Sequence, residues 1–221
     1  MKYPISVQDK LHDGRMSRAF VELLKLHIQP GSLILDPTAG SHLLWQAYTE
    51  ADNDLIKDID PPYEIKFSDI KGGEENIIQN LAFVQEDWPE WEESFDCVVY
   101  DPPYLIGENA TNDPREEKYG AYCFSEEDLK AYMAYIPRQI RWLLKPKGRL
   151  ILKCSDQYVV SQRKFYPHHY EWMRRMVLSF TIIDIMIYRH HRMSPTAFQV
   201  KNRPCSVVMH TYYIVGEKND E

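Results

Sequence analysis

The sequence predicts an α/β fold: a Rossmann-like, doubly wound and mostly parallel seven-stranded sheet that ends in a C-terminal antiparallel β-hairpin. Short apolar segments, among them 33–35 and 95–100, alternate with longer segments whose apolar residues recur at helical spacing. Both of these apolar segments run into an Asp-Pro turn, at Asp36-Pro37 and at Asp101-Pro102. Alternating strands and helices are typical of parallel sheets covered on both faces.

The first half of the chain predicts one long helix and several buried strands. Apolar residues recur at helical spacing over 16–28, and Pro30-Gly31 ends the pattern. The continuous apolar run at 33–35 indicates a strand covered on both faces, and a helix is expected over 42–48. Further strands are expected at 64–68, 82–85 and 95–100.

The second half continues the alternation and closes it with a hairpin. A helix is predicted over 126–144, with Pro137 as a candidate kink, and a strand over 149–153. Lys153, at the end of that strand, could face the active site but is not among the predicted site residues. The remaining expected elements are a helix near 168–178 and antiparallel strands at 180–188 and 207–215. We expect residues 1–221 to form a single domain.

Composition points to a cytoplasmic protein without a metal. No apolar stretch of the 221 residues approaches the span of a bilayer, and the chain starts without an apolar signal region. The four cysteines are scattered without paired spacing, which favours a reducing compartment. The His168-His169 and His190-His191 pairs lack partners at metal-ligand spacing, so no metal is expected.

The charge is unevenly distributed along the chain. The net charge is −7, but residues 1–110 hold 8 Lys and Arg against 21 Asp and Glu, whereas residues 111–221 hold 18 against 12. A basic half can face the phosphates of a nucleic acid. A solvated face is the alternative interpretation.

The tetrapeptide Asp101-Pro102-Pro103-Tyr104 follows the predicted strand at 95–100. Prolines have no N–H, so their carbonyls act as acceptors without a competing donor. A carboxylate and one such carbonyl can accept both hydrogens of an exocyclic amine, and a tyrosine can stack on the ring that carries it. These residues therefore predict a pocket for a planar amino-base. The same letters at 60–63 lie in a polar stretch and predict a rigid turn.

A second site is predicted at the turn after the strand at 33–35. Strand, small-residue turn and helix are the layout of a nucleotide-type site, with Asp36, Pro37, Thr38, Ala39, Gly40 and Ser41 forming the turn. Asp36 is expected to hold an ammonium group, Asp69 to accept from ribose hydroxyls and Asp87 to contact an adenine amine. S-adenosylmethionine has an amino-acid end and an adenosine end, whereas the Gly-x-Gly-x-x-Gly turn of dinucleotide sites is absent.

With these motifs the chain resembles the S-adenosylmethionine-dependent DNA amino-methyltransferases, which methylate N6 of adenine or N4 of cytosine. The segment 35–41 is similar to the family's Asp-Pro-x-x-Gly-Ser cofactor motif, and 101–104 to its catalytic motif, in the order cofactor motif first. The segment containing Arg15 and Ser17 is similar to the stretch that contacts the methionine end. His42 departs from the family, which often has a second glycine there.

The resemblance implies direct methyl transfer to an exocyclic amine, held by the carboxylate of Asp101 and the carbonyl of Pro102. It favours N6 of adenine in DNA, with N4 of cytosine close behind and a flipped-out base if the target is a duplex. An RNA base, a small molecule and a non-catalytic partner subunit are the alternatives.

The expected partner is duplex DNA, with a homodimer or a specificity partner possible, because no separate target-recognition domain is visible. The segment 105–124 is predicted to be a mobile substrate loop. Candidate nucleic-acid contacts are Tyr119, Tyr122, Arg189 and Arg192.

Overall fold

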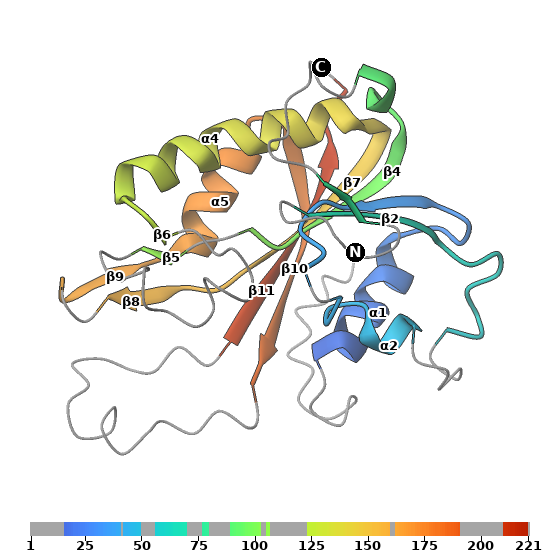
Figure 1. The fold of residues 1–221 in the computed structure, drawn as a ribbon, viewed down its shortest axis with the longest axis horizontal. Coiled ribbons are helices and arrows are strands. Elements are labelled where there is room, and N and C mark those ends of the chain that lie inside the picture. Colours follow the sequence, from blue (N-terminus) through green and yellow to red (C-terminus); the bar gives the residue numbers. More distant parts are fainter. Residues whose placement is uncertain are drawn as a thin grey trace.

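A computed structural model describes residues 16–40, 42–49, 56–69, 77–79, 89–102, 105–106, 123–159, 162–190 and 210–220. Its main feature is a seven-stranded sheet with the strand order β10-β11-β7-β4-β1-β2-β3 (Figure 1). The strands are β1 Leu33–Asp36, β2 Glu64–Asp69, β3 Ile77–Gln79, β4 Phe95–Tyr100, β7 Leu144–Cys154, β10 Phe180–Arg189 and β11 His210–Lys218.

The sheet is mixed. Pairing is parallel from β3 through β2, β1 and β4 to β7, whereas β11 runs antiparallel to both β7 and β10. The predicted terminal hairpin is therefore present, and β11 alone of the seven strands runs against the others. Because β10 is antiparallel to β11, its carboxyl end lies at the same edge of the sheet as those of β1, β4 and β7.

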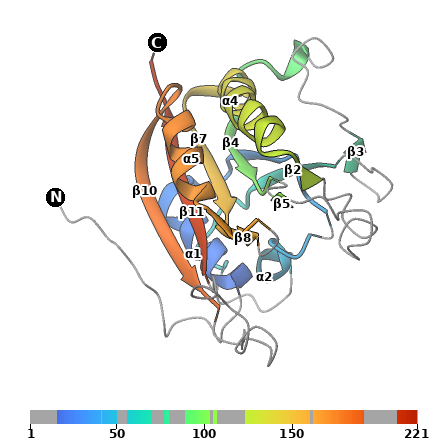
Figure 2. The same ribbon diagram turned by 90° about the vertical axis from the view of Figure 1, so that its left-hand side faces the viewer.

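Helices cover both faces of this sheet (Figure 2). On one face, α1 Met16–His27 and α2 Gln46–Thr49 lie over a core that includes Phe20 and Trp45, while α4 Glu126–Leu143 and α5 His168–Met176 cover the other. Successive side chains of β4 alternate between the two faces of the sheet: Cys97 and Val99 lie in the first core, and Val98 and Tyr100 lie in the second. Burial on both faces explains why the central strands are continuously apolar.

Several boundaries differ from the prediction. A strand lies at Ile77–Gln79, where none was predicted, and the predicted strand at 82–85 lies outside the described residues. The expected helix at 42–48 is reduced to α2, because 42–45 forms a turn in which the Trp45 N–H donates to the His42 carbonyl. The helix α4 runs through Pro137 without a break. A short 3-10 helix at Pro89–Trp91 and two minor sheets were not predicted.

The minor sheets lie beside the carboxyl edge of the main sheet. One pairs β5 Leu105–Ile106 with β6 Cys123–Phe124, which are the two ends of the predicted loop at 105–124. The interior of that loop lies outside the described residues. The other pairs β8 Gln157–Val159 with β9 Lys164–Tyr166 in antiparallel fashion.

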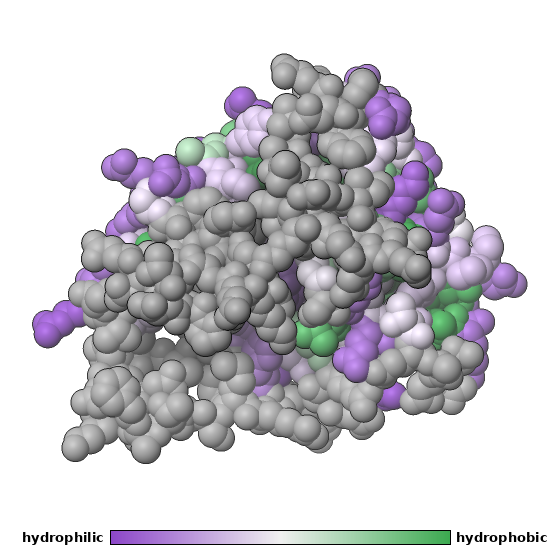
Figure 3. Space-filling model, viewed as in Figure 1, coloured by the Kyte–Doolittle hydropathy of each residue, from purple (hydrophilic) through white to green (hydrophobic). Residues whose placement is uncertain are grey.

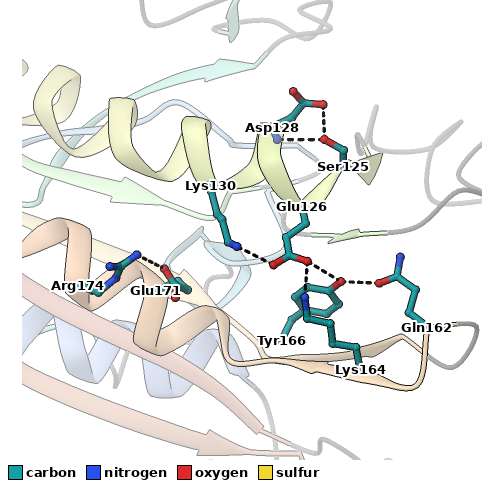
Figure 4. A network of polar contacts seen from close by, with 9 residues as sticks. All are labelled: Ser125, Glu126, Asp128, Lys130, Gln162, Lys164, Tyr166, Glu171 and Arg174. Carbon is teal, nitrogen blue, oxygen red and sulfur yellow. Dashed lines mark hydrogen bonds and ion pairs between the residues drawn. The ribbon is translucent and has the colours of Figure 1, made fainter.

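The start of α4 holds the β8–β9 hairpin in place (Figure 4). Ser125 caps the helix by accepting from the Asp128 N–H at 3.1 Å. The Glu126 carboxylate accepts from Lys130 at 2.7 Å and also from Lys164 and Tyr166 of β9. The hydrogen bonds from Lys130 and Lys164 lower the pKa of Glu126 to about 2. The hairpin that follows β7 is thus tied to α4.

The first Asp-Pro-Pro-Tyr copy is a structural turn, as predicted. It leads into β2, and the Asp60–Pro61 peptide bond is cis. Tyr63 is buried, and its hydroxyl donates to the Ile28 carbonyl at 3.2 Å. Its backbone N–H donates to the Tyr48 hydroxyl at 2.9 Å. These contacts pack the turn against the ends of α1 and α2.

We predict that Gly216→Ala lowers the free energy of unfolding by about 1–3 kcal/mol. Gly216 lies in the middle of β11, and a Cβ added there would meet the Cβ of Phe180 at 2.9 Å and the Cε of Met176 at 3.1 Å. Backbone or core side chains must therefore shift to admit a methyl group. Urea denaturation followed by circular dichroism measures the change, and an unaltered midpoint would contradict this packing.

Candidate active site

The candidate site lies at the carboxyl ends of three adjacent strands. Asp36 ends β1, Asp101 directly follows β4, and Lys153 is the last residue but one of β7. From β1 the chain continues to β2 and β3 on one side, and from β4 it continues to β7 on the other. The boundary between β1 and β4 is thus a topological switch point, where open α/β sheets bind their ligands.

Asp36 organises the turn after β1. Its carboxyl group is only 2% exposed and accepts from the Trp45 indole Nε1 at 2.6 Å and from the Thr38 N–H at 2.9 Å. Burial raises the pKa of Asp36 to about 6, because the hydrogen bonds from Trp45 and Thr38 offset only part of the desolvation. The hydrogen bond from the Trp45 indole also holds the start of α2 against the end of β1.

The Thr38 hydroxyl connects this turn to the second motif. It donates to Asp36 Oδ1 at 3.1 Å and accepts from the Asp101 backbone N–H at 2.9 Å. The next residue of the turn, Ala39, donates its N–H to the Ser68 carbonyl of β2 at 3.2 Å. The turn after β1 therefore has hydrogen bonds to the strands on both of its sides.

Asp101 is held from a third strand as well. The Lys153 ammonium donates to Asp101 Oδ2 in a short ion pair, with the two side chains 15% and 30% exposed respectively. Within the part of the chain that the structure describes, Asp101 Oδ1 makes no hydrogen bond. Pro102, the next residue, is buried. Lys153 was not among the predicted site residues, although its position at a strand end indicated that it could face the active site.

His42 replaces a family glycine and takes a glycine-like conformation. Its φ is 55°, in the left-handed region that histidine adopts more readily than most residues. The imidazole stacks on Phe67 of β2, with ring centroids 4.3 Å apart and an interplanar angle of 20°. This turn conformation explains why the helix starts later than the sequence predicts.

The other predicted site residues divide into three groups. Pro37 and Ala39 lie in the turn after β1, and Gly40 has a φ of 51° there. Ser17 is buried in the first turn of α1, Asp69 ends β2, and the exposed Arg189 ends β10 at the same sheet edge as Lys153. Outside the described residues lie Arg15, Ser41, Asp87, Pro103, Tyr104, Tyr119, Tyr122 and Arg192.

The described residues contain neither a metal-ligand cluster nor a membrane-spanning helix. Among the described residues, no group of three or more His, Cys, Asp or Glu side chains is placed to bind a metal ion. In the same part of the chain, no helix has the length and apolarity needed to cross a membrane. On the face shown in Figure 3, polar side chains predominate among the described residues and apolar ones are scattered between them.

The family follows from a sequence comparison. The model of the Eco57I restriction-modification methylase family matches residues 24–192, which include all three strand ends of the site. The chain belongs to this family. No curated protein matches it. The resemblance to DNA methyltransferases is thus confirmed for most of the chain, although it does not decide between adenine and cytosine.

Solved structures agree on the fold. TrmN from Thermus thermophilus is 14% identical, with a TM-score of 0.52 over 92% of this chain and 48% of its own. A Galdieria sulphuraria protein, provisionally assigned as a sarcosine dimethylglycine methyltransferase, is 12% identical, with a TM-score of 0.54 over 93% and 86%. The PvuII cytosine-N4-specific DNA methyltransferase is 16% identical, with a TM-score of 0.42 over 57% and 43%.

The methyltransferase fold is therefore shared with the first two of these structures, and their low identity supports no more than the fold. The chain spans about half the length of TrmN, the first structure compared.

We predict that Asp36 makes folding pH-dependent between about pH 4 and pH 6. The folded-state pKa is about 6 against an ordinary value of 3.8, so the native state binds this proton more tightly than the unfolded state. The stabilisation is therefore complete below pH 3.8 and is lost as the pH rises through 6, by roughly 3 kcal/mol.

Urea denaturation of the wild type and of Asp36→Asn across this range isolates the effect. The difference between their free energies of unfolding should change over the interval and level off above it. Parallel pH profiles for the two proteins would contradict the buried carboxyl group.

Proposed function

We propose that this chain transfers the methyl group of S-adenosylmethionine to the exocyclic amino group of a base in DNA, most directly N6 of adenine. The observation that carries the proposal is the position of Asp101, which directly follows β4 beside the turn after β1. Lys153 occupies its Oδ2, and Oδ1 accepts no hydrogen bond from the residues that the structure describes. Membership of the Eco57I restriction-modification methylase family supports DNA as the substrate.

The turn after β1 suits the cofactor. Among the described residues other than its chain neighbours, a Cβ at Gly40 would meet just one heavy atom within 4 Å, the Thr38 carbonyl oxygen at 3.8 Å, so these residues leave room for a close ligand. Asp69, at the end of the neighbouring strand β2, is proposed to accept from the ribose hydroxyls, and Asp87 to contact the adenine. When bound, S-adenosylmethionine supplies an electrophilic methyl group.

Asp36 acts in this proposal mainly through the turn. Its carboxyl group is buried and already accepts from Trp45 and Thr38. An ammonium group at the methionine end would therefore add to an acceptor that is largely occupied. We assign Asp36 the role of shaping the turn, with the ammonium contact as its secondary role.

The protein acts on the base by positioning its amine. Asp101 Oδ1 and the Pro102 carbonyl are proposed to accept its two N–H hydrogens, which aims the nitrogen lone pair at the methyl group. Transfer would form a bond from this nitrogen to the methyl carbon as the bond from that carbon to the cofactor sulfur breaks, which releases S-adenosylhomocysteine. The adjacent Asp101 carboxylate would stabilise the positive charge that develops on the nitrogen, and the nitrogen would then lose one proton to solvent. Tyr104 is proposed to stack on the ring. A target in a duplex must be flipped out to reach this pocket.

The choice of adenine rests on Asp as the first residue of the tetrapeptide, which in the resembling family is commoner for adenine than for cytosine. N4 of cytosine is the second candidate because it presents the same pair of N–H hydrogens beside a ring nitrogen.

Purified protein should be incubated with labelled S-adenosylmethionine and, in parallel, with duplex DNA, single-stranded DNA and RNA. Digestion to nucleosides and mass spectrometry then identify the product. The proposal expects N6-methyladenine in DNA. N4-methylcytosine in DNA would make cytosine, not adenine, the target base. Label in RNA alone, or in none of the three substrates, would contradict a DNA methyltransferase.

We predict that Asp101→Asn lowers kcat by at least about 100-fold and changes the Kd of S-adenosylmethionine by less than about threefold. An asparagine whose oxygen accepts from Lys153 must turn its NH2 group toward the substrate amine. Two hydrogen-bond donors would then face each other, so the amine would lose its acceptor. Asp58→Asn is the control, because Asp58 is 68% exposed and makes only a 3.7 Å pair with Lys25 among the described side chains. Parallel loss of cofactor binding and activity would instead indicate a structural role.

A further inference from the structure

The segment 153–157, from the end of β7 to the start of β8, contacts the tetrapeptide 101–104 and the residue that lies two positions beyond it. Lys153, near the end of β7, pairs with Asp101, the first residue of the motif. Gln157, the first residue of β8, contacts Ile106, two residues beyond the motif. The segment 153–157 therefore contacts the chain at the first residue of the motif and again two residues beyond its end.

The Gln157 contact is a reciprocal pair of hydrogen bonds. The Ile106 N–H donates to Gln157 Oε1 at 2.9 Å, and Gln157 Nε2 donates to the Ile106 carbonyl at 3.0 Å. A carboxamide that satisfies both backbone groups of one residue takes the place of a neighbouring strand. Ile106 itself is buried, 5% exposed, in the core beneath α4.

The segment 153–157 is itself anchored to two other elements. The buried Asp156 accepts from the His169 N–H at 3.2 Å and from its Nδ1 at 2.7 Å, at the start of α5. Ser155 Oγ and Thr211 Oγ1 of β11 share a hydrogen bond of 3.0 Å. Contacts on both sides make the segment a rigid support, and rigid supports hold reacting groups within the small tolerances that catalysis requires.

We propose that Lys153 and Gln157 are positioning residues that clamp the catalytic tetrapeptide, Lys153 at its first residue and Gln157 just beyond its end. Lys153 binds Asp101 Oδ2, which turns Oδ1 toward the substrate amine, while Gln157 fixes the backbone where the chain leaves the motif. The inference rests on the proposed methyl transfer to an amine. In this proposal Lys153 acts through the Asp101 carboxylate, whose orientation it sets.

The clamp carries an electrostatic cost as well as a geometric gain. The ammonium of Lys153 offsets part of the negative charge that Asp101 offers to the positive transition state. A role in positioning therefore predicts that removing Lys153 lowers kcat, whereas a purely electrostatic view predicts that it raises kcat. The sign of the change separates the two.

Lys153→Met, Lys153→Arg and Lys147→Met should be compared with the wild type. Lys147 is the matched control, because it lies on β7 at the opposite edge of the sheet and pairs with Asp220 while 63% exposed. We expect Lys153→Met to lower kcat about 100-fold with the KM for DNA and the Kd of S-adenosylmethionine nearly unchanged. Lys153→Arg should recover most of this loss, and Lys147→Met should match the wild type.

Hydrogen exchange tests Gln157 without activity. Gln157→Glu keeps the acceptor for the Ile106 N–H but sets a carboxylate oxygen against the Ile106 carbonyl. We expect the peptide containing Ile106 to exchange faster in this variant, with peptides from α4 unchanged, and kcat to fall.

The outcomes separate the two proposals. Wild-type protein that methylates no base in DNA overturns the proposed function, and the exchange of Ile106 then decides the clamp alone. A kcat of Lys153→Met within about threefold of the wild type, or a joint loss of cofactor affinity, overturns the positioning role. Unchanged exchange in Gln157→Glu overturns the second half of the clamp.

Discussion

The hydroxyl of Thr38 holds the two motifs of this protein together, and the geometry of the site depends on it. A hydroxyl has one hydrogen to donate and lone pairs with which to accept. By donating to Asp36 Oδ1 and accepting from the Asp101 N–H, Thr38 uses both capacities at once. The backbone that would approach the cofactor and the backbone that would approach the base thus share one side chain.

From this bridge a line of polar contacts crosses three strands. It runs from the Trp45 indole to Asp36 after β1, through Thr38 to Asp101 after β4, and on to Lys153 of β7. Asp36 is almost fully buried, so its hydrogen bonds are costly to leave unmade. A turn with this many satisfied partners is held in one conformation, which places Thr38 reproducibly beside Asp101.

The elements that could be predicted from the sequence are those with a strong local signal. The helix α1 and the strands β1 and β4 have continuous or periodic apolar patterns, and both motifs stand where strand ends were expected. The start of α2 was not predictable, because His42 adopts a positive φ that the sequence pattern does not reveal. The contacts of Lys153 and Gln157 depend on the pairing of β7 with β4, which is a long-range property.

Substitution of Thr38 shows whether its hydroxyl holds the two motifs together. Thr38→Val keeps the shape of the side chain and removes the hydroxyl, whereas Thr38→Ser keeps the hydroxyl. Calorimetric titration with S-adenosylmethionine and single-turnover methyl transfer should both be measured on each variant. We predict that the valine variant binds the cofactor about tenfold or more less tightly and transfers the methyl group about tenfold or more slowly, while the serine variant stays close to the wild type. A valine variant that retains both properties would contradict a site built around this hydroxyl.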